Sequence, residues 1–246
     1  MSADGRTARE PVFLRAEWRT LAMLNFEVER AILAPSIPAG TELDDWSGRA
    51  VVSVVGLVFR RTRVLGLPVP FHRSFDEVNL RFYVRRRGEQ GWRHGIVFVE
   101  ELVPRAAVTW AARTLYGENY STARVRHETE ASDARRLVRY LWSRRGGEGR
   151  MELVSEGSSD PAAPGSEAEF ITDRPWGYTR RGSGWTQEYR VAHPRWNVWI
   201  AQRASVEGET LALFGQPFAP FLAGAPRSAF LADGSEVAVH APHRLR

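Results

Sequence analysis

A polar face runs along one strand-like segment of this chain and carries the side chains best suited to chemistry. Residues 78 to 85 alternate strictly between apolar and polar types, so that Asn79, Arg81 and Tyr83 share one face of a strand with Glu77 just before them. An arginine there would bind a carboxylate or phosphate through its bidentate fork, and a neighbouring glutamate would stay ionised or act as a base. If this face points into a barrel, the four residues line a pocket.

The same alternation has a simpler interpretation. It is also typical of a half-buried strand whose polar face is solvated and carries an ordinary arginine and glutamate pair at the surface. Taken by themselves, the residues favour this second interpretation. It leads to a different function, a non-enzymatic interaction or scaffold protein whose basic surface meets an acidic partner or nucleic acid.

Two further clusters have polar or aromatic side chains at suggestive positions. Glu118 and Tyr120 follow the predicted helix over residues 105 to 115, next to the glycine at position 117 that ends it. Functional loops often lie at such places, but a polar turn between helix and strand is the favoured explanation of the pattern. The second cluster is aromatic: Trp176, Tyr178, His193, Trp196 and Trp199. Aromatic residues at strand spacing are more typical of core packing than of a base-stacking platform.

Composition excludes several classes of mechanism. The chain has no lysine and no cysteine, so a lysine Schiff base, a thiol nucleophile, a disulfide and a cysteine-bound metal are all ruled out. No Walker A loop, nucleophile elbow or zincin helix occurs. Among six histidines only His240 and His243 are close in sequence, and a solvated tail explains them, so we expect no metal and no cofactor.

Charge and hydropathy bear on partners and location. The formal net charge of +5 comes entirely from arginine on the positive side, with acidic residues interspersed, so a nucleic-acid partner is not indicated. Residues 1 to 10 lack an apolar signal region. The longest apolar run, residues 50 to 59, has about half the length of a membrane helix and is typical of a buried strand. These patterns predict a cytoplasmic location and no membrane partner, while the oligomeric state is left open.

The elements that must position these residues are mostly strands. Strands are predicted at residues 50–60, 78–85, 95–103, 121–128, 136–144, 151–155, 176–181, 185–191, 196–206 and 236–240. Besides the helix at 105–115, short helical pieces are expected at 29–33, at 166–170 behind a Ser166/Glu169 capping box, and at 210–214. Residues 1–11 are expected to be a flexible tail and 12–246 a single domain. The fold class is therefore α+β, mainly antiparallel, with a closed barrel-like sheet and few helices.

Five phrases of the sequence resemble those of the YqjF-like proteins, domain-of-unknown-function family 2071. They lie at residues 13–19, 75–84, 117–120, 169–172 and 193–196. That family has no established activity to transfer. It is in turn similar in fold to acetoacetate decarboxylase, which implies a curved antiparallel sheet closed around a central cavity, and this favours the pocket interpretation.

The resemblance also shows what this chain lacks. In the decarboxylases a lysine after the long helix forms the Schiff base, whereas the corresponding residues here, 119 to 122, are Asn-Tyr-Ser-Thr and offer no amine. A pocket carboxylate at Glu77 is implied to persist. We therefore expect an internal pocket for a small anionic or carbonyl-bearing metabolite, with any chemistry being acid/base and non-covalent.

Overall fold

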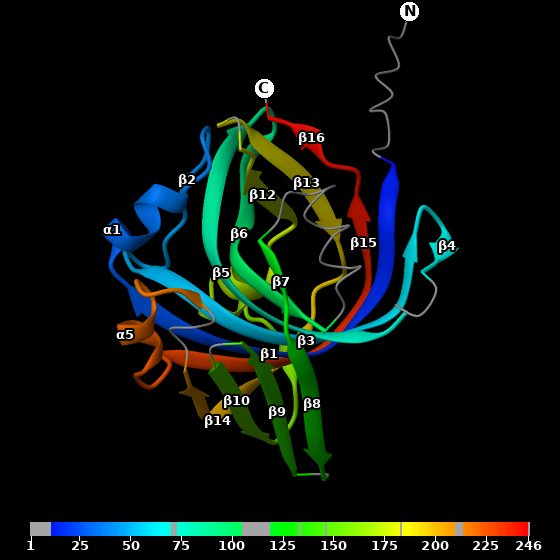
Figure 1. Cartoon of the computed structure of the whole chain (residues 1–246), viewed down its shortest axis with the longest axis vertical. Coiled ribbons are helices and arrows are strands. Elements are labelled where there is room, and N and C mark those ends of the chain that lie inside the picture. Colours follow the sequence, from blue (N-terminus) through cyan, green and yellow to red (C-terminus); the bar gives the residue numbers. More distant parts are fainter. Residues whose placement is uncertain are drawn as a thin grey trace, which may run out of the picture.

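The computed structural model describes residues 11–69, 73–104, 119–132, 134–145, 147–182, 184–209 and 214–245. The predicted helix at 105–115, the candidate residue Glu118 and most of the predicted helix at 210–214 lie outside these ranges. Within them the chain is mainly antiparallel strand with few and short helices, as the sequence predicts (Figure 1).

Seven strands form a closed ring. Their order is β13-β12-β6-β5-β3-β1-β15, and β13 pairs with both β12 and β15, which completes the circuit. Every neighbouring pair in the ring is antiparallel except β6 and β12. The ring strands are β1 (Val12–Val28), β3 (Ala50–Val64), β5 (Phe75–Gly88), β6 (Gly91–Val103), β12 (Trp176–Arg180), β13 (Thr186–Ala192) and β15 (Ser228–His240). The barrel-like sheet expected from the sequence is thus present.

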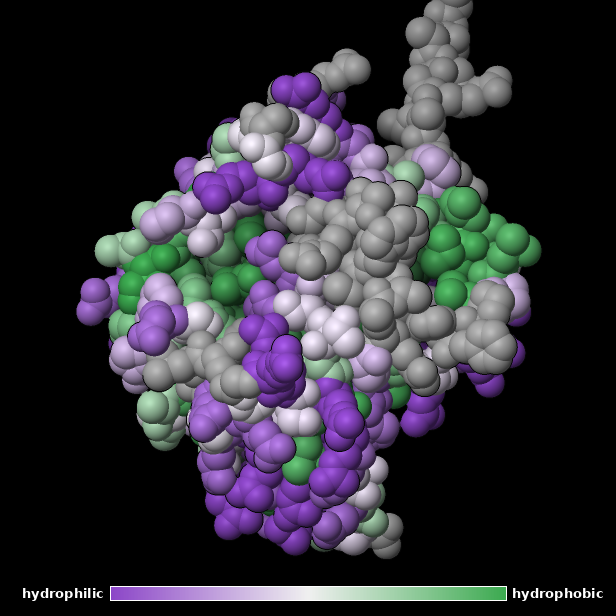
Figure 2. All heavy atoms as spheres, viewed as in Figure 1, coloured by the Kyte–Doolittle hydropathy of each residue, from purple (hydrophilic) through white to green (hydrophobic). Residues whose placement is uncertain are grey.

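A second group of strands extends from the ring and packs beneath it (Figure 1). It comprises β8 (Arg124–Ala131), β9 (Arg135–Arg144), β10 (Gly147–Glu156) and β14 (Asn197–Gly208). Tyr140 fixes the packing of this group against the ring. Its aromatic ring lies so close to Gly56 that a Cβ atom at position 56 would be 2.3 Å from the aromatic ring. The Tyr140 hydroxyl also donates to the Thr20 carbonyl at 2.8 Å. The outer side of this group is largely hydrophilic, at the bottom of Figure 2.

The remaining elements are short. Two-residue or three-residue strands are β2 (Glu42–Leu43), β4 (Leu67–Pro68), β7 (Tyr120–Thr122), β11 (Asp160–Pro161) and β16 (His243–Arg244). The helical pieces are α1 (Arg30–Leu33), the 3-10 turn η1 (Ala34–Ser36), α3 (Glu167–Thr172) and α5 (Ala219–Leu222). No helix in the described ranges is long and apolar enough to cross a membrane.

Strand β5 is buried on both faces over residues 77–84, so its polar side chains there do not face solvent. Its apolar residues Val78, Leu80, Phe82 and Val84 have no exposed surface and pack in a core shared with β9, β10 and α5. The opposite face must then point into the ring, toward a second core that includes Tyr83. The interpretation that the residues alone favour, a polar face exposed to solvent, is therefore wrong.

The predicted capping box at α3 is confirmed in part. Ser166 Oγ accepts from the Glu169 backbone N–H at 3.2 Å, as a capping box requires. The Glu169 carboxylate reaches back to the N–H of Gly165 at 2.7 Å and not to that of Ser166. This fixes the start of a short helix that covers one part of the ring interior.

Candidate functional site

Four of the predicted site residues lie together inside the ring. Glu77 and Asn79 are each 2% exposed, Arg81 is 8% exposed and Tyr83 is fully buried. Their convergence follows from the alternation of β5, which places every second side chain on its inner face. Tyr120, another predicted residue, joins them from β7.

The Glu77 carboxylate is held by two donors. Asn79 Nδ2 donates to one oxygen at 2.9 Å, and the Tyr120 hydroxyl donates to the other at 3.4 Å. Burial raises the pKa of Glu77 to about 7, although both hydrogen bonds and the positive charge of Arg81 act in the opposite direction. This carboxyl can therefore take up or release a proton near neutral pH.

A second buried carboxyl stands beside this one. Glu101 on β6 is 1% exposed and lies directly opposite Asn79, with Tyr120 as its neighbour on β7. A bulge in β6 shifts the pairing, so that Arg81 lies opposite Phe98 instead of the residue after it. Sequence reasoning missed Glu101, because nothing in the Glu100–Glu101 pair shows which of the two faces the interior.

Arg81 is a buried cation without a carboxylate partner among the described residues. Its Nη2 donates to the Ile171 carbonyl at 3.2 Å and lies 3.7 Å from the Met23 sulfur. Its Nε has no hydrogen-bond partner in the described ranges, and no carboxylate there lies within 4.0 Å. Burying a guanidinium without such compensation costs several kcal/mol. A bound anion would supply the missing partner.

The Tyr83 hydroxyl belongs to a buried relay of polar groups. It lies 2.5 Å from Ser53 Oγ, which in turn donates to Asn25 Oδ1 at 2.6 Å. Since the single Ser53 proton goes to Asn25, Tyr83 must be the donor to Ser53. The relay ends at Ser228, whose hydroxyl accepts from Asn25 Nδ2 at 3.0 Å. Tyr83 is therefore held in place and keeps acceptor capacity for a further group.

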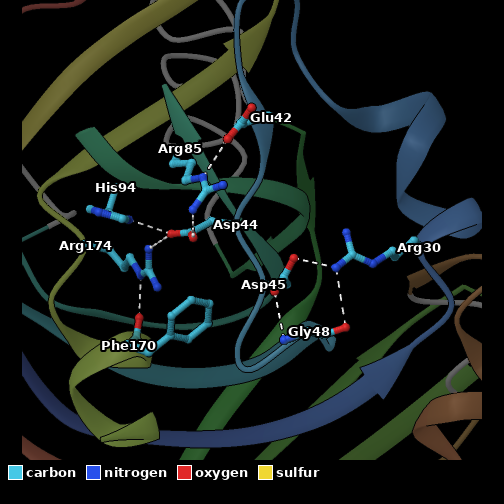
Figure 3. A network of polar contacts seen from close by, with 9 residues as sticks. All are labelled: Arg30, Glu42, Asp44, Asp45, Gly48, Arg85, His94, Phe170 and Arg174. Atoms are coloured by element: carbon cyan, nitrogen blue, oxygen red, sulfur yellow. Dashed lines mark hydrogen bonds and ion pairs between the residues drawn. The ribbon is translucent and has the colours of Figure 1, made fainter. Parts of the chain in front are cut away.

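A buried ion pair fixes the segment that follows α3 (Figure 3). Arg174 Nη1 bonds to the Asp44 carboxylate, its Nε donates to the Phe170 carbonyl, and its guanidinium stacks 3.8 Å from the Phe170 ring centre. His94 Nδ1 meets the same carboxylate at 2.6 Å. Burial alone would raise the pKa of Asp44, but His94 and Arg174 hold it below its usual range.

His193 lies near the end of α3. It stacks on Trp196 with ring centres 4.1 Å apart, and burial together with the charge of Arg81 lowers the pKa of His193. A cavity of about 10 Å³ lined by residues including Thr172, His193 and Trp196 has room for roughly one water. The aromatic cluster singled out in the sequence otherwise packs in the two cores, as its simpler interpretation predicts.

The two C-terminal histidines are held by protein groups. His240 Nε2 lies 3.3 Å from an Arg190 nitrogen, and His243 Nε2 lies 3.1 Å from Glu188. Among the residues that the structure describes, no three histidine, aspartate or glutamate side chains gather as metal ligands would.

A separate open cleft of about 620 Å³ lies on the four-stranded group. Its lining includes Arg124, Arg126 and Glu148, together with Arg150 and Glu207, which already pair with each other at 2.5 Å. Because its charges are largely matched and exposed, the ring interior remains the stronger candidate.

The fold matches solved structures of acetoacetate decarboxylase type. The acetoacetate decarboxylase of Legionella pneumophila has a TM-score of 0.66 and 12% identity, and the match covers 96% of this chain and 88% of that one. An acetoacetate decarboxylase-like enzyme from Sphingomonas wittichii RW1 has a TM-score of 0.66 and 14% identity, with 95% and 93% of the two chains covered. The enduracididine biosynthesis enzyme MppR complexed with pyruvate has a TM-score of 0.65 and 14% identity, with 100% and 95% covered. At these identities the likeness shows the fold alone.

Similarity in sequence points to a family without a described activity. The uncharacterized protein YqjF of Bacillus subtilis (strain 168) is 30% identical over 116 residues, which make up 47% of this chain and 46% of YqjF, so the match spans about half the length of that relative. Residues 15–236 match the family DUF2071, described as an uncharacterized conserved protein. The chain therefore belongs to the DUF2071 family.

Proposed function

We propose that the ring interior binds a small anionic or carbonyl-bearing metabolite, with Arg81 as the anion-binding group and Glu77 as the group that exchanges a proton. The observation that carries this proposal is the buried Arg81 guanidinium, whose Nε has no partner and which has no carboxylate within 4.0 Å in the described ranges. A ligand carboxylate or enolate would satisfy it through a charge-assisted hydrogen bond.

The groups around Arg81 supply the rest of the proposed site. Glu77, with its pKa raised to about 7 by burial, acts as acid or base, while Asn79 and Tyr120 orient its two oxygens. Tyr83 adds a fixed hydroxyl on the far side of Arg81. Polar atoms that converge within an apolar surround are typical of small-molecule sites.

The likeness to known structures supports the ligand class and restricts the chemistry. The structure of MppR holds pyruvate, a carboxylate with an adjacent carbonyl. Because this chain has no lysine, none of its side chains can form an imine with such a compound. Proton transfer to or from a carbonyl compound, without a covalent intermediate, is the chemistry that the remaining groups support.

The competing interpretation, an interaction protein with a polar strand facing solvent, loses its basis at β5. That interpretation requires Asn79, Arg81 and Tyr83 to be accessible from outside, and all three are buried.

A ligand screen with Arg81→Met tests the proposal. The native chain is screened by thermal unfolding against 2-oxo acids, 3-oxo acids and dicarboxylates, and a binding compound at 100 times its Kd should raise Tm by about 5 °C or more. Arg81→Met should lose this rise, while its own stability stays equal or increases by about 1–4 kcal/mol, because an uncompensated buried charge has been removed.

The matched control is Arg85→Met, on the same strand, where the side chain is 40% exposed and pairs with Glu42. It should keep the ligand response. Loss of the response in both variants, or its survival in Arg81→Met, would contradict the assignment. Borohydride reduction with a bound oxo acid should leave no adduct on an internal side chain.

A further inference from the structure

The hairpin of β3 and β4 carries an apolar tip that nothing in the described chain covers. Leu65 and Leu67 are 70% and 71% exposed, and Val64 and Val69 beside them are partly exposed. In Figure 1 this hairpin stands out at the right edge of the molecule, and Figure 2 shows a hydrophobic patch at the same place. Together with these valines, the two leucines form a contiguous apolar patch, which is more informative than a single exposed apolar side chain.

The turn at the tip is unusual for the residue that occupies it. Val64 pairs with Leu67, which leaves Leu65 and Gly66 as a two-residue turn with φ of 50° and 82°. A turn with positive φ at both positions favours Asn-Gly, because leucine is strained there. The Leu65 N–H donates to the Phe13 carbonyl at 2.8 Å, so the turn is anchored to β1 with its leucines outward.

Arginines surround the base of this tip. Arg15 and Arg63 lie directly opposite each other on β1 and β3, and both are exposed. Arg73 joins them, since its carbonyl accepts from the Thr62 N–H at 3.0 Å. None of the three makes an ion pair within the described ranges, and like charges directly opposite on a sheet are destabilising. The arrangement calls for an anionic partner.

We propose that the β3–β4 hairpin binds the surface of an anionic lipid bilayer. Leu65 and Leu67 enter the boundary between headgroups and acyl chains, and Arg15, Arg63 and Arg73 hold lipid phosphates above them. Guanidinium groups match the geometry of phosphate, and the methylene groups of the same arginine side chains can pack against the apolar part of the interface. The expectation of no membrane partner rested on the lack of a spanning segment, and surface binding requires none.

Other partners fit the tip less well. A symmetric contact between two copies of the chain would bring the arginines of one hairpin against those of the other. A nucleic acid would satisfy the arginines but leave Leu65 and Leu67 in water. A lipid surface offers both phosphate and hydrocarbon to a single hairpin.

Co-sedimentation of the full chain with vesicles tests this proposal. Binding is expected to phosphatidylcholine vesicles that contain phosphatidylglycerol and not to phosphatidylcholine alone. Leu67→Gln and Leu65→Asn should each weaken binding by about tenfold or more, because each removes an apolar side chain that the bilayer buries on binding. Asparagine suits the positive φ at Leu65, so that variant should keep its melting temperature.

The matched controls lie on β14, away from the hairpin. Ile200→Gln, at a side chain 67% exposed, should leave vesicle binding unchanged. Arg63→Gln should weaken binding by about fivefold, whereas Arg203→Gln should not. Binding to neutral vesicles, no binding at all, or equal effects at hairpin and control positions would overturn the proposal. The proposal would also be overturned if the native chain did not bind vesicles and Leu67→Gln had a lower molecular mass than the native chain by light scattering. That result would indicate a second copy of the chain as the partner.

Discussion

At the scale of residues, the interior of the ring combines a carboxyl group whose pKa is raised by burial with a buried guanidinium group. Glu77 and Arg81 are buried on the same face of β5 and sense each other electrostatically, yet they are not joined by an ion pair. An ion pair would hold the carboxyl ionised and fill the donors of the guanidinium. Their separation leaves one group free to titrate and the other free to bind.

The raised pKa of Glu77 predicts how stability depends on pH. Between its ordinary value of 4.5 and about 7 the folded chain retains a proton that the unfolded chain has released. The free energy of unfolding should therefore fall as pH rises through this window, by about 3 kcal/mol, and level off above it. Glu77→Gln cannot titrate, so its urea-unfolding profile should lack this fall. Glu42→Gln, at an exposed glutamate, serves as control and should retain it. Parallel profiles for the native chain and Glu77→Gln would refute the assignment.

Part of this site could be predicted from the sequence and part could not. The inward set on β5 follows from strict alternation beside four apolar residues, once the ring is known to exist. Glu101 could not be assigned, because its orientation depends on a bulge that changes the phase of β6. Asn25 and Ser53 could not be found either, since single polar residues within apolar runs give no signal of what they contact.

At the scale of elements, α3 is too short to hold its position by helical stability alone. The ion pair between Arg174 and Asp44 connects the end of this helix to the segment after β2 and, through His94, to β6. The Ile171 carbonyl that bonds to Arg81 lies within α3. Anchoring the helix thus also sets the position of one contact to the proposed anion-binding group.

Asp44→Asn should destabilise the fold by about 3 kcal/mol at neutral pH, because it leaves the buried Arg174 guanidinium uncompensated. The depressed pKa of Asp44 implies that this carboxylate stabilises the fold above its ordinary pKa and stops doing so as pH falls through its folded-state value. The loss measured by urea unfolding should therefore shrink at low pH. Asp45→Asn, at the exposed pair with Arg30 in Figure 3, should cost about 1 kcal/mol or less. Equal losses of unfolding free energy in both variants would show that the buried Asp44 pair stabilises the fold no more than the exposed Asp45 pair does.

Sequence patterns located most of the longer strands, but they missed β1 and predicted only the last part of β15. The apolar positions between residues 18 and 29 keep no helical period and also no clean alternation, because β1 has register shifts near Glu17 and Ala22 and a positive φ at Thr20. The last strand was expected only at 236–240, whereas β15 begins at Ser228 and continues through Gly234 at φ 80°. Irregularities that bend a sheet into a ring are the features that hide its strands from pattern analysis.

At the scale of the whole molecule, pairing across the Pro/Gly/Ser-rich loop at 157–165 supports one domain over residues 12–246. Strand β10 precedes this loop and pairs with β14 after it, and β1 pairs with β15. Limited proteolysis within the loop should give a nicked chain that elutes as one species and separates only in denaturant. Two fragments that each fold alone would defeat the single-domain prediction.

The order of strands around the ring also has a consequence for biosynthesis. Arg19 and Gly234 lie across from each other on β1 and β15, although 215 residues separate them in the chain. At ordinary rates of translation β1 would wait on the order of 10 s or longer for its last partner. During that time β1-β3-β5-β6 is an open sheet with a free edge, the kind of surface that recruits strands from other chains. Pairing with β15 covers this edge of β1, so closure of the ring is the step that removes it as a site for strand addition.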